Sequence, residues 1–336
     1  MMAADLAPDL ATAAEVLGPL AERDRSLAPF CTYRVGGPAA LFVQAESIDD
    51  LLTVRRAVVA AGCPTLVVGR GSNLLVADAG FPGLAVTLGG GFADIRIDGQ
   101  DNPEASQERD TAGPVTVVVG AAALLPVVAR KTAAAGLTGF EWAVGVPGSI
   151  GGAVRMNAGG HGSDMAASLH RVWLVDLAAD GRTTGGGEET GTGRTVRMVE
   201  DLALGYRRSA IEPSQVVTAA ELRLDRGDAE TAGAEISEIV RWRREHQPGG
   251  QNAGSVFANP DGDSAGRIID QLGLKGFRIG TAEVSTKHAN FIQADPGGSA
   301  DDVVALIREI RLRVAAATGI ELMVENRLIG FDPGDL

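Results

Sequence analysis

The sequence predicts an α+β fold in which strands and helices alternate along three consecutive blocks. In the first block, two short apolar runs at 40–45 and 65–69 enclose an amphipathic segment, which is the pattern of a β-α-β unit. In the second block, an apolar run at 115–120 precedes a helical pattern at 124–136. In the third block, residues 301–319 carry apolar side chains at helical spacing. A chain of 336 residues also exceeds one ordinary core, so we expect several subdomains.

End signals and periodicity place the individual helices. Ser47 and Asp50 have the spacing of a capping box, and Gly62 marks the end of the helix that follows them. Residues 234–246 gather their isoleucines on one face and end in a basic turn, as an amphipathic helix does. We therefore divide the chain into an N-terminal extension, two central blocks and a C-terminal block: 1–23, 24–86, 87–225 and 226–336.

Two polar inserts, 98–113 and 185–194, interrupt the second block. They lack apolar periodicity and are rich in glycine and charged residues. We expect them to form hairpin tips or disordered loops.

Composition and charge exclude several classes of protein. The net charge of −13 argues against a nucleic-acid surface, whereas a small anionic ligand needs only a few local cations. Cys31 and Cys63 form no CxxC pair or zinc-type cluster, so we expect neither a disulfide scaffold nor a metal. The N-terminus is acidic, unlike a signal peptide, and no apolar run is long enough to cross a membrane. We expect a cytoplasmic protein that binds neither nucleic acid nor membrane and requires no oligomer.

Two glycine-rich loops indicate a phosphate-containing ligand. The sequence GRGSN at 69–73 follows a predicted strand, but Leu74 breaks the GxGxxG pattern of a Rossmann dinucleotide site. The sequence PGSIGGAVRMNAGG at 147–160 holds five glycines, which we expect to exclude a regular helix or strand. Backbone N–H groups of both loops would hold a pyrophosphate from two sides without a basic side chain. Short polar side chains add donors, namely Ser72, Asn73, Ser149 and Asn157.

Seven segments make the chain resemble the UDP-N-acetylenolpyruvoylglucosamine reductase (MurB) family. In chain order they read TYRVGGPA (32–39), VVGRGSNLLVAD (67–78), GLTGFEWAVGVPGSIGGAVRMNAG (136–159), GYRRS (205–209), NAGSVFANP (252–260), AGRIIDQLGLKG (265–276) and VSTKHANFI (284–292). The resemblance implies a two-part FAD-binding region of vanillyl-alcohol-oxidase (PCMH) type and a C-terminal α+β substrate-binding domain. It also implies that NADPH reduces non-covalent FAD, and that the enzyme converts UDP-N-acetyl-3-O-(1-carboxyvinyl)-glucosamine to UDP-N-acetylmuramate for peptidoglycan synthesis.

The resemblance implies that the loop 147–160 lies against the pyrophosphate and ribityl chain of FAD, where a side chain would collide with the cofactor. The cofactor-binding residues that the resemblance implies are Arg34, Gly69, Arg70, Gly71, Ser72, Asn73, Leu74, Pro147, Gly148, Ser149, Gly151, Gly152, Asn157, Ala158 and Gly159.

The chemistry of this reduction requires a hydride at C3 of the enolpyruvyl group and a proton at C2. The enolate formed between the two steps needs a cation or hydrogen bonds, and then a nearby proton donor. The resemblance implies Ser255 as the proton donor, Arg207 as the arginine that faces the carboxylate, and Glu325 as the acidic partner. Arg208 is the alternative to Arg207. Where the family usually has Pro-Glu-Val-Arg, residues 324–327 read Val-Glu-Asn-Arg.

The substrate's diphosphate and uridine require cations and polar side chains. One branch of the family places a Tyr from an extra loop over the substrate, but the segment between Arg207 and Ser255 holds no Tyr, so the chain resembles the other branch. The Lys-His pair at 287–288 suits a phosphate and also fits an ordinary surface pair. The candidates are Tyr206, Arg243, Arg244, Asn259, Lys287, His288 and Asn290.

Two alternatives come from other classes of protein. Another FAD oxidase of the same fold would carry a covalent flavin, for which His161, just after the second glycine loop, is the candidate. The second alternative is a nucleotide-binding protein without enzymatic activity. Loss of flavin absorbance on addition of NADPH would exclude it.

Overall fold

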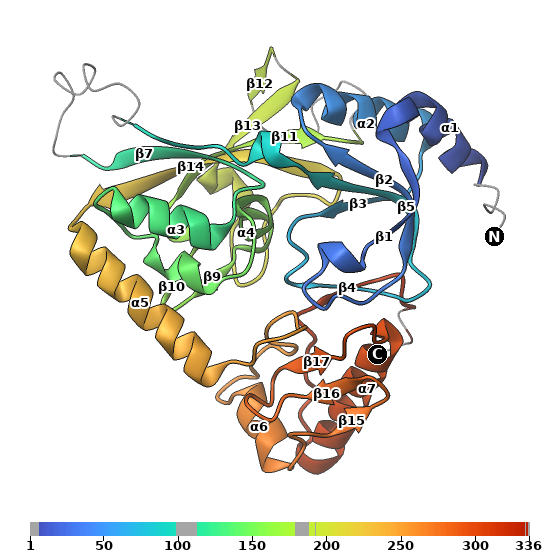
Figure 1. Cartoon of the computed structure of the whole chain (residues 1–336), viewed down its shortest axis with the longest axis vertical. Coiled ribbons are helices and arrows are strands. Elements are labelled where there is room, and N and C mark those ends of the chain that lie inside the picture. The colour runs from blue at the N-terminus through green and yellow to red at the C-terminus, as the bar shows by residue number, and fades with distance from the viewer. Residues whose placement is uncertain (1–6, 99–112, 179–187, 192, 333, 335–336) are drawn as a thin grey trace. The chain divides into compact units, whose positions relative to one another are not determined.

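The structure is a computed structural model that describes residues 7–98, 113–178, 188–191, 193–332 and 334 (Figure 1). The chain divides into two compact units, each assembled from segments that are distant in the sequence. The first unit contains residues 1–21, 43–69 and 85–242, and the second contains 22–42, 70–84 and 243–336.

The predicted β-α-β unit is confirmed as strand β2 (Pro38–Ala45), helix α2 (Ile48–Ala61) and strand β3 (Thr65–Val68). The side chain of Ser47 accepts from the N–H of Asp50 at 3.2 Å while Asp50 accepts from the N–H of Ser47 at 3.0 Å, which completes the capping box. Gly62 ends α2 in the left-handed conformation. The sheet order is β1-β2-β5-β3, and the other two strands are β1 (Glu22–Ser26) and β5 (Phe81–Leu88).

A larger antiparallel sheet forms the framework of the first unit. Its order is β12-β13-β11-β14-β7-β6, and β8 pairs with the end of β14. The alternating valines of β7 are buried, and they share a core with helices α3 (Leu125–Ala134), α4 (Ile150–Met156) and α5 (Ala229–His246). Helices α3 and α4, green in Figure 1, lie along one face of this sheet. The strands are β6 (Ile95–Ile97), β7 (Val115–Gly120), β8 (Leu137–Thr138), β11 (Leu169–Asp176), β12 (Glu188–Thr190), β13 (Arg194–Met198) and β14 (Gln215–Arg226).

One helix of the first unit, α5, is longer than the sequence predicted. Helix α3 (Leu125–Ala134) lies where it was predicted, whereas α5 (Ala229–His246) begins five residues before the predicted 234. The carboxylate of Asp228 accepts from the N–H of Thr231 at 2.7 Å, so this aspartate caps the earlier start. Helix α1 (Pro8–Leu17) packs on α2 within the segment assigned to an extension.

Both polar inserts fall between antiparallel neighbours. Residues 99–112 lie outside the described residues, and the strands on either side of them, β6 and β7, pair antiparallel. The described part of the second insert belongs to the hairpin of β12 and β13, which confirms a hairpin there. The rest of that insert, 185–187 and 192, lies outside the described residues.

The second unit packs two helices on a small antiparallel sheet. Strands β15 (Arg278–Ile279), β16 (Ala282–Val284) and β17 (Ile292–Ala294) pair in that order and share a core with α6 (Ala265–Gln271) and α7 (Ala300–Thr318). Helix α7 confirms the predicted 301–319 helix. Strands β4 (Leu74–Val76) and β18 (Arg327–Ile329) pair in parallel, so the first glycine loop is joined to the C-terminal segment.

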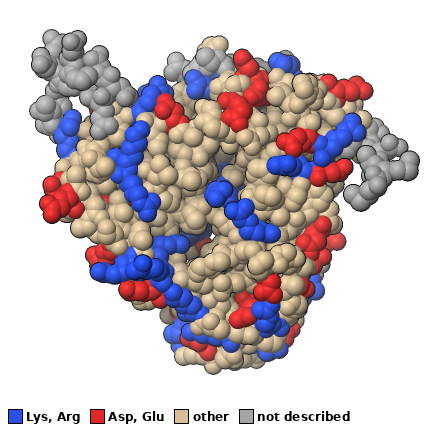
Figure 2. Space-filling view, in the orientation of Figure 1, with Lys and Arg blue, Asp and Glu red and all other residues tan. Residues whose placement is uncertain are grey.

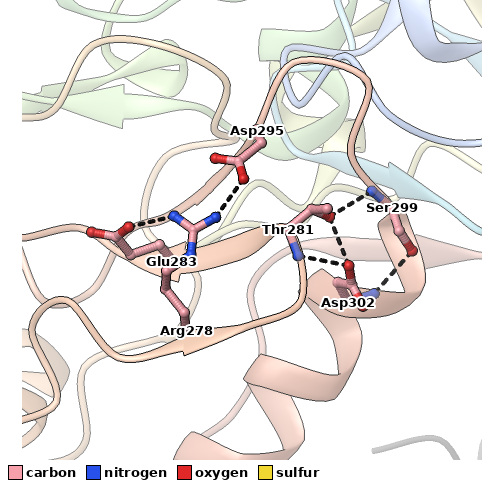
Figure 3. A network of polar contacts seen from close by, with 6 residues as sticks. All are labelled: Arg278, Thr281, Glu283, Asp295, Ser299 and Asp302. Carbon is pink, nitrogen blue, oxygen red and sulfur yellow. Dashed lines mark hydrogen bonds and ion pairs between the residues drawn. The ribbon is translucent and has the colours of Figure 1, made fainter.

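A polar network ties α7 to this sheet (Figure 3). The carboxylate of Asp302 accepts from the N–H and the hydroxyl of Thr281, both at 2.7 Å, and Ser299 caps the helix. Arg278 bridges the carboxylates of Glu283 and Asp295 beside it.

Candidate active site

In the first unit, Gly69, the first residue of the GRGSN loop, lies against the second glycine loop. A Cβ atom on Gly69 would lie 3.1 Å from the Oγ atom of the buried Ser149 and 3.9 Å from the Cα atom of Gly152. A side chain at residue 69 would therefore crowd the start of the second loop. The backbones of the two loops approach each other here because both positions lack side chains.

The prediction that residues 147–160 exclude a regular element is wrong for helix α4 (Ile150–Met156). A Cβ atom on Gly151 would lie 3.0 Å from the Cβ atom of Ala121, and the N–H of Gly151 donates to the Ala121 oxygen at 2.9 Å. Gly151 thus permits a close approach of α4 to the segment that follows β7. This tertiary contact outweighs the low helix propensity of glycine.

Asn157 joins this helix to the turn of the GYRRS motif. It ends α4 in the left-handed conformation, with φ of 40°. Its amide nitrogen donates to the carboxylate of Asp164 at 3.0 Å and to the carbonyl of Gly205 at 3.3 Å. Both amide hydrogens are therefore used within the protein, and the expected side-chain donor to an anion is already engaged.

A pocket of about 500 Å³ lies beside this junction. The hairpin of β9 (Gly159–Gly160) and β10 (Ser163–Asp164) forms part of its wall. A Cβ atom on Gly162 would meet no described atom within 4 Å, and one on Gly160 would meet only Val146, at 4.0 Å. The bare backbone therefore leaves space open that side chains would fill. The volume falls in the usual range for small-molecule sites, about 300–1,000 Å³.

Arg207 lines this pocket from a strained turn. Gly205 and Arg208 exchange two backbone hydrogen bonds of 3.1 Å, which leaves Tyr206 and Arg207 at the centre of the turn. Arg207 has a φ of 54°, a conformation that side chains disfavour and that gathers at functional sites. Its guanidinium lies 5.4 Å from the centre of the Tyr206 ring.

The structure distinguishes the two neighbouring arginines. The side chain of Arg208 lies against its own turn, since a Cβ atom on Gly205 would come within 2.6 Å of the Arg208 Nε atom. Arg207 lines the pocket, and Tyr206 beside it is 70% exposed; the catalytic role of Arg207 stays a prediction.

Ser255 and Glu325 lie on paired segments of the second unit. Phe257 and Val324 form an antiparallel bridge, and the N–H of Glu325 donates to the carbonyl of Val256 at 2.8 Å. Ser255 is therefore one residue from the position opposite Glu325. Both residues were candidates from the motifs. The pairing of the two segments that carry them is a tertiary contact that the sequence does not show.

Asn290 supports the Ser255 segment from a different strand connection. Its amide nitrogen donates to the carbonyl of Phe257 at 2.8 Å, and its amide oxygen accepts from the N–H of Phe257 at 2.9 Å. The backbone oxygen of Asn290 also accepts from Val256. We find this predicted substrate residue holding the protein backbone with both ends of its side chain.

The predicted phosphate-binding side chains differ in charge. Partial burial lowers the pKa of the Arg243 guanidinium, and Arg243 pairs with no carboxylate among the described residues. The amine of Lys287 donates to the carbonyl of Arg244. Burial, with a smaller effect from Lys275, lowers the pKa of His288, whose Nδ1 atom accepts from the N–H of Asn290. His288 is therefore neutral near pH 7 and supplies no cation.

The remaining predicted residues lie in loops or at the ends of helices and strands. In the second unit, Arg34 has a φ of 58°, and a Cβ atom on Gly71 would come within 2.1 Å of the Phe30 oxygen. The amide of Asn73 donates to the Glu325 carbonyl at 3.1 Å, and Asn259 accepts from the first residue of α6. Arg70 and Ser72 lie in the same loop, Leu74 begins β4, Pro147 and Gly148 precede α4, and Ala158 and Gly159 follow it.

His161 lies in the turn of the hairpin of β9 and β10. Its ring meets the Trp242 ring edge-on, with ring centres 5.2 Å apart. In the described part of the chain, none of the helices is both long and apolar enough to span a membrane, and no group of three or more acidic, His or Cys residues is arranged for a metal. On the face in Figure 2, basic and acidic side chains are interspersed.

Comparisons with known proteins agree with this arrangement. Residues 39–185 match the FAD binding domain family, and residues 246–329 match the UDP-N-acetylenolpyruvoylglucosamine reductase C-terminal domain family. The UDP-N-acetylenolpyruvoylglucosamine reductase of Rubrobacter xylanophilus is 38% identical over 94% of this chain and 97% of that protein. The corresponding protein of Heliobacterium modesticaldum is 40% identical over 91% of this chain and 89% of that protein.

A solved structure gives the same result. The crystal structure of UDP-N-acetylenolpyruvylglucosamine reductase (MurB) from Thermus caldophilus matches with a TM-score of 0.71 and 35% identity, over 92% of this chain and 98% of that one. The resemblance and the fold class predicted from the motifs are thus confirmed. By fold, motifs and similarity along nearly its whole length, the chain belongs to the UDP-N-acetylenolpyruvoylglucosamine reductase family.

Proposed function

We propose that the chain reduces UDP-N-acetyl-3-O-(1-carboxyvinyl)-glucosamine to UDP-N-acetylmuramate, with Arg207, Ser255 and Glu325 acting on the substrate. Membership of the family supports the reaction, with FAD as cofactor and NADPH as co-substrate. The observation that carries the residue assignment is Arg207 in the wall of a glycine-lined pocket, on a turn with positive φ. Bound FAD supplies hydride transfer, from NADPH to C3 of the enolpyruvyl group.

The two glycine loops fit FAD. The bare backbones of Gly69 and Gly152 approach each other around Ser149, and the open positions at Gly160 and Gly162 leave room along the pocket. Phosphate oxygens are bound well by backbone N–H groups, so these loops would hold the pyrophosphate without a basic side chain. The fit agrees with the match of residues 39–185 to the FAD binding domain family.

Arg207 stabilises negative charge on the substrate. Its guanidinium would face the carboxylate, where the enolate spreads its charge as C3 gains a hydride. A planar cation with several donors suits a carboxylate better than an ammonium group does. Hydrogen bonds of Gly205 to Arg208 and to Asn157 fix the turn around Arg207. The cation is therefore positioned before the substrate binds.

Ser255 would donate the proton to C2, with Glu325 as its acidic partner. A serine hydroxyl is a weak acid, so this role requires a strongly basic acceptor, which an enolate carbon provides. The hydrogen bond between the Glu325 N–H and the Val256 carbonyl holds the two segments together. The loop that carries Ser255 is thereby kept in register with the acidic residue.

The cations Arg243, Arg244 and Lys287 would bind the diphosphate of the UDP group. Arg243 has lost part of its hydration, and a bound anion would compensate for that loss. Asn259 and the exposed Tyr206 remain candidates for the polar and ring contacts of the nucleotide sugar. The neutral His288 would contribute packing or a hydrogen bond.

We extend the proposal to domain roles and location. Residues 24–86 and 87–225 would form the two-part FAD-binding region, and residues 226–336 would bind the substrate. Two family matches, 39–185 and 246–329, support this division. The proposed reaction belongs to the cytoplasm and calls for no second copy of the chain.

The spectrum of the purified protein tests the proposal. We expect a yellow protein whose absorbance near 450 nm bleaches with NADPH without oxygen and returns when the enolpyruvyl substrate is added. Heat denaturation should release all the colour, because the flavin is not covalently attached. Colour retained on the precipitated chain would instead favour attachment at His161. A colourless protein, or one that the substrate does not reoxidise, would contradict the proposal.

A further inference from the structure

Asn326 is a buried polar residue at the position where the family usually has Val. It is 5% exposed, and its amide nitrogen donates to the Oδ1 atom of Asn73 at 3.0 Å and to the carbonyl of Ala253 at 3.2 Å. Its own amide oxygen is buried and has no hydrogen-bond partner among the described residues. A buried amide with one unsatisfied end is unfavourable for folding, so stability alone gives no reason for Asn here.

The hydrogen bond from Asn326 orients the amide of Asn73. A donor can bond only to the oxygen of that amide, so the nitrogen of Asn73 is left to point the other way. There it donates to the backbone carbonyl of Glu325 at 3.1 Å. The Glu325 N–H donates to the Val256 carbonyl, so Glu325 is held at both of its backbone polar groups.

The second hydrogen bond from Asn326 reaches the loop that carries Ser255. Ala253 lies two residues before Ser255, and Val256 follows it. One amide therefore joins three segments of the second unit: the first glycine loop, the Ser255 loop and the C-terminal segment.

We propose that Asn326 is a positioning residue, which fixes Glu325 by orienting the amide of Asn73 and fixes the Ser255 loop by its own hydrogen bond to Ala253. The inference rests on the proposed function of Ser255 and Glu325. With Val at position 326, Asn73 would lose the donor that orients its amide, and Ala253 would lose its partner. The proton transfer to C2 would then begin from a less defined geometry, while the reaction with NADPH would be unchanged.

The first test measures the two half-reactions of flavin-loaded Asn326→Val by stopped flow. We expect reduction by NADPH within about twofold of the wild-type rate, and reoxidation by the enolpyruvyl substrate slower by about tenfold, as small misplacements of reacting groups produce. Ser299→Ala, which removes the cap of α7 in the same unit, is the matched control for lost stability and should reoxidise at the normal rate. Normal reoxidation in Asn326→Val, or equal loss in both half-reactions, would overturn the inference.

The second test uses Asn326→Asp to give the effect a pH signature. Only the protonated carboxyl can donate to Asn73, and burial raises the pKa of a carboxyl. The reoxidation rate should therefore be near normal at low pH and fall as the pH rises through that pKa, a step that the wild type and Asn326→Val lack. A parallel pH profile in all three proteins would contradict the proposed hydrogen bond.

Combining variants separates this inference from the proposed function. If Asn326 acts through Glu325 and the Ser255 loop, then Asn326→Val should cause no further loss in a variant that already carries both Glu325→Gln and Ser255→Ala. If Ser255→Ala and Glu325→Gln both react as the wild type does, the catalytic assignment fails. Hydrogen exchange of the backbone amides then still tests the positioning role, because the amides of residues 323–327 and 253–257 should exchange faster in Asn326→Val than in the wild type. Unchanged exchange there would refute the positioning role.

Discussion

Ser209 donates its hydroxyl hydrogen to the backbone oxygen of Arg155 at 2.7 Å, which ties the turn that carries Arg207 to the last turn of α4. Ser209→Ala should loosen this turn and slow reoxidation by substrate by about tenfold, because Arg207 would be less well placed. Stopped-flow measurement of both half-reactions checks this expectation. Ser237→Ala, which removes a similar hydroxyl bond to Gly233 on the exposed face of α5, is the control and should leave both rates normal.

Arg207→Ala should slow reoxidation by substrate by about 10²-fold and leave flavin reduction by NADPH nearly unchanged, because the proposed role of this cation is to stabilise charge on the substrate carboxylate. Arg207→Lys should recover part of the rate, since it restores charge without the planar donors. Arg208→Ala is the matched control from the same turn. Equal losses in the Arg207 and Arg208 variants would mean that the turn, and not the cation, matters.

Ser255→Ala should keep its fold and its FAD, because a small hydroxyl is lost and little volume changes. Reoxidation by the substrate should fall by about 10²–10⁴-fold, the usual effect of removing a positioned proton donor. Ser255→Cys should restore part of the rate, since a thiol also donates a proton. The measurement is the stopped-flow rate of flavin reoxidation by the enolpyruvyl substrate in each Ser255 variant, with identification of the product. A wild-type rate in Ser255→Ala would move the proton donor elsewhere, with Glu325 or a water next in line.

Gly151→Ala should lower the free energy of unfolding by about 1–3 kcal/mol, because the added methyl group would meet Ala121 at 3.0 Å. Gly233→Ala, in the interior of α5, should instead raise it by about 0.5–1 kcal/mol, since a Cβ atom there meets no described atom within 4 Å. Denaturant unfolding of both variants with FAD bound gives the comparison. Similar stabilities would show that α4 can move away from Ala121 at little cost.

Asp302→Asn should remove part of the acid sensitivity of the second unit. Hydrogen bonds from the side chain and backbone of Thr281 lower the pKa of Asp302, so the folded state favours the carboxylate. The stability that this gives is full above the unfolded pKa of about 3.9 and is lost as the pH falls through the lower folded value. Urea unfolding at about pH 7 and about pH 3 should show a smaller difference for the variant than for the wild type.

Local signals predicted the regular elements well where the ends carry polar caps. The capping box at Ser47 and the left-handed Gly62 lie where the sequence indicated them, and α7 agrees with the predicted range 301–319 to within one residue at each end. Helix α4 was missed because the approach of Gly151 to Ala121 is a tertiary contact. The early start of α5 was missed because Gly233 weakened the helical pattern, while Asp228 supplied a cap.

The motifs named candidate site residues, and the catalytic roles of these residues stay predictions. The motif favoured Arg207 over Arg208, and the structure adds that Arg207 has a positive φ and lines the pocket, whereas the side chain of Arg208 lies against its own turn. Asn157 and Asn290 belong to the motifs, yet their amides hold Gly205 and Phe257. A motif contains both the residues that act on the substrate and the residues that support them. The sequence alone therefore does not separate the two kinds.

The left-handed backbone at Arg207 has a consequence for directed evolution. Glycine adopts this conformation without strain, so Arg207→Gly would relax the turn while it removes the cation. A library screened only for survival after heating would be enriched in glycine at this position and would lose turnover in the same step. Selection for thermal tolerance in this enzyme therefore has to be coupled to growth or product formation at every round.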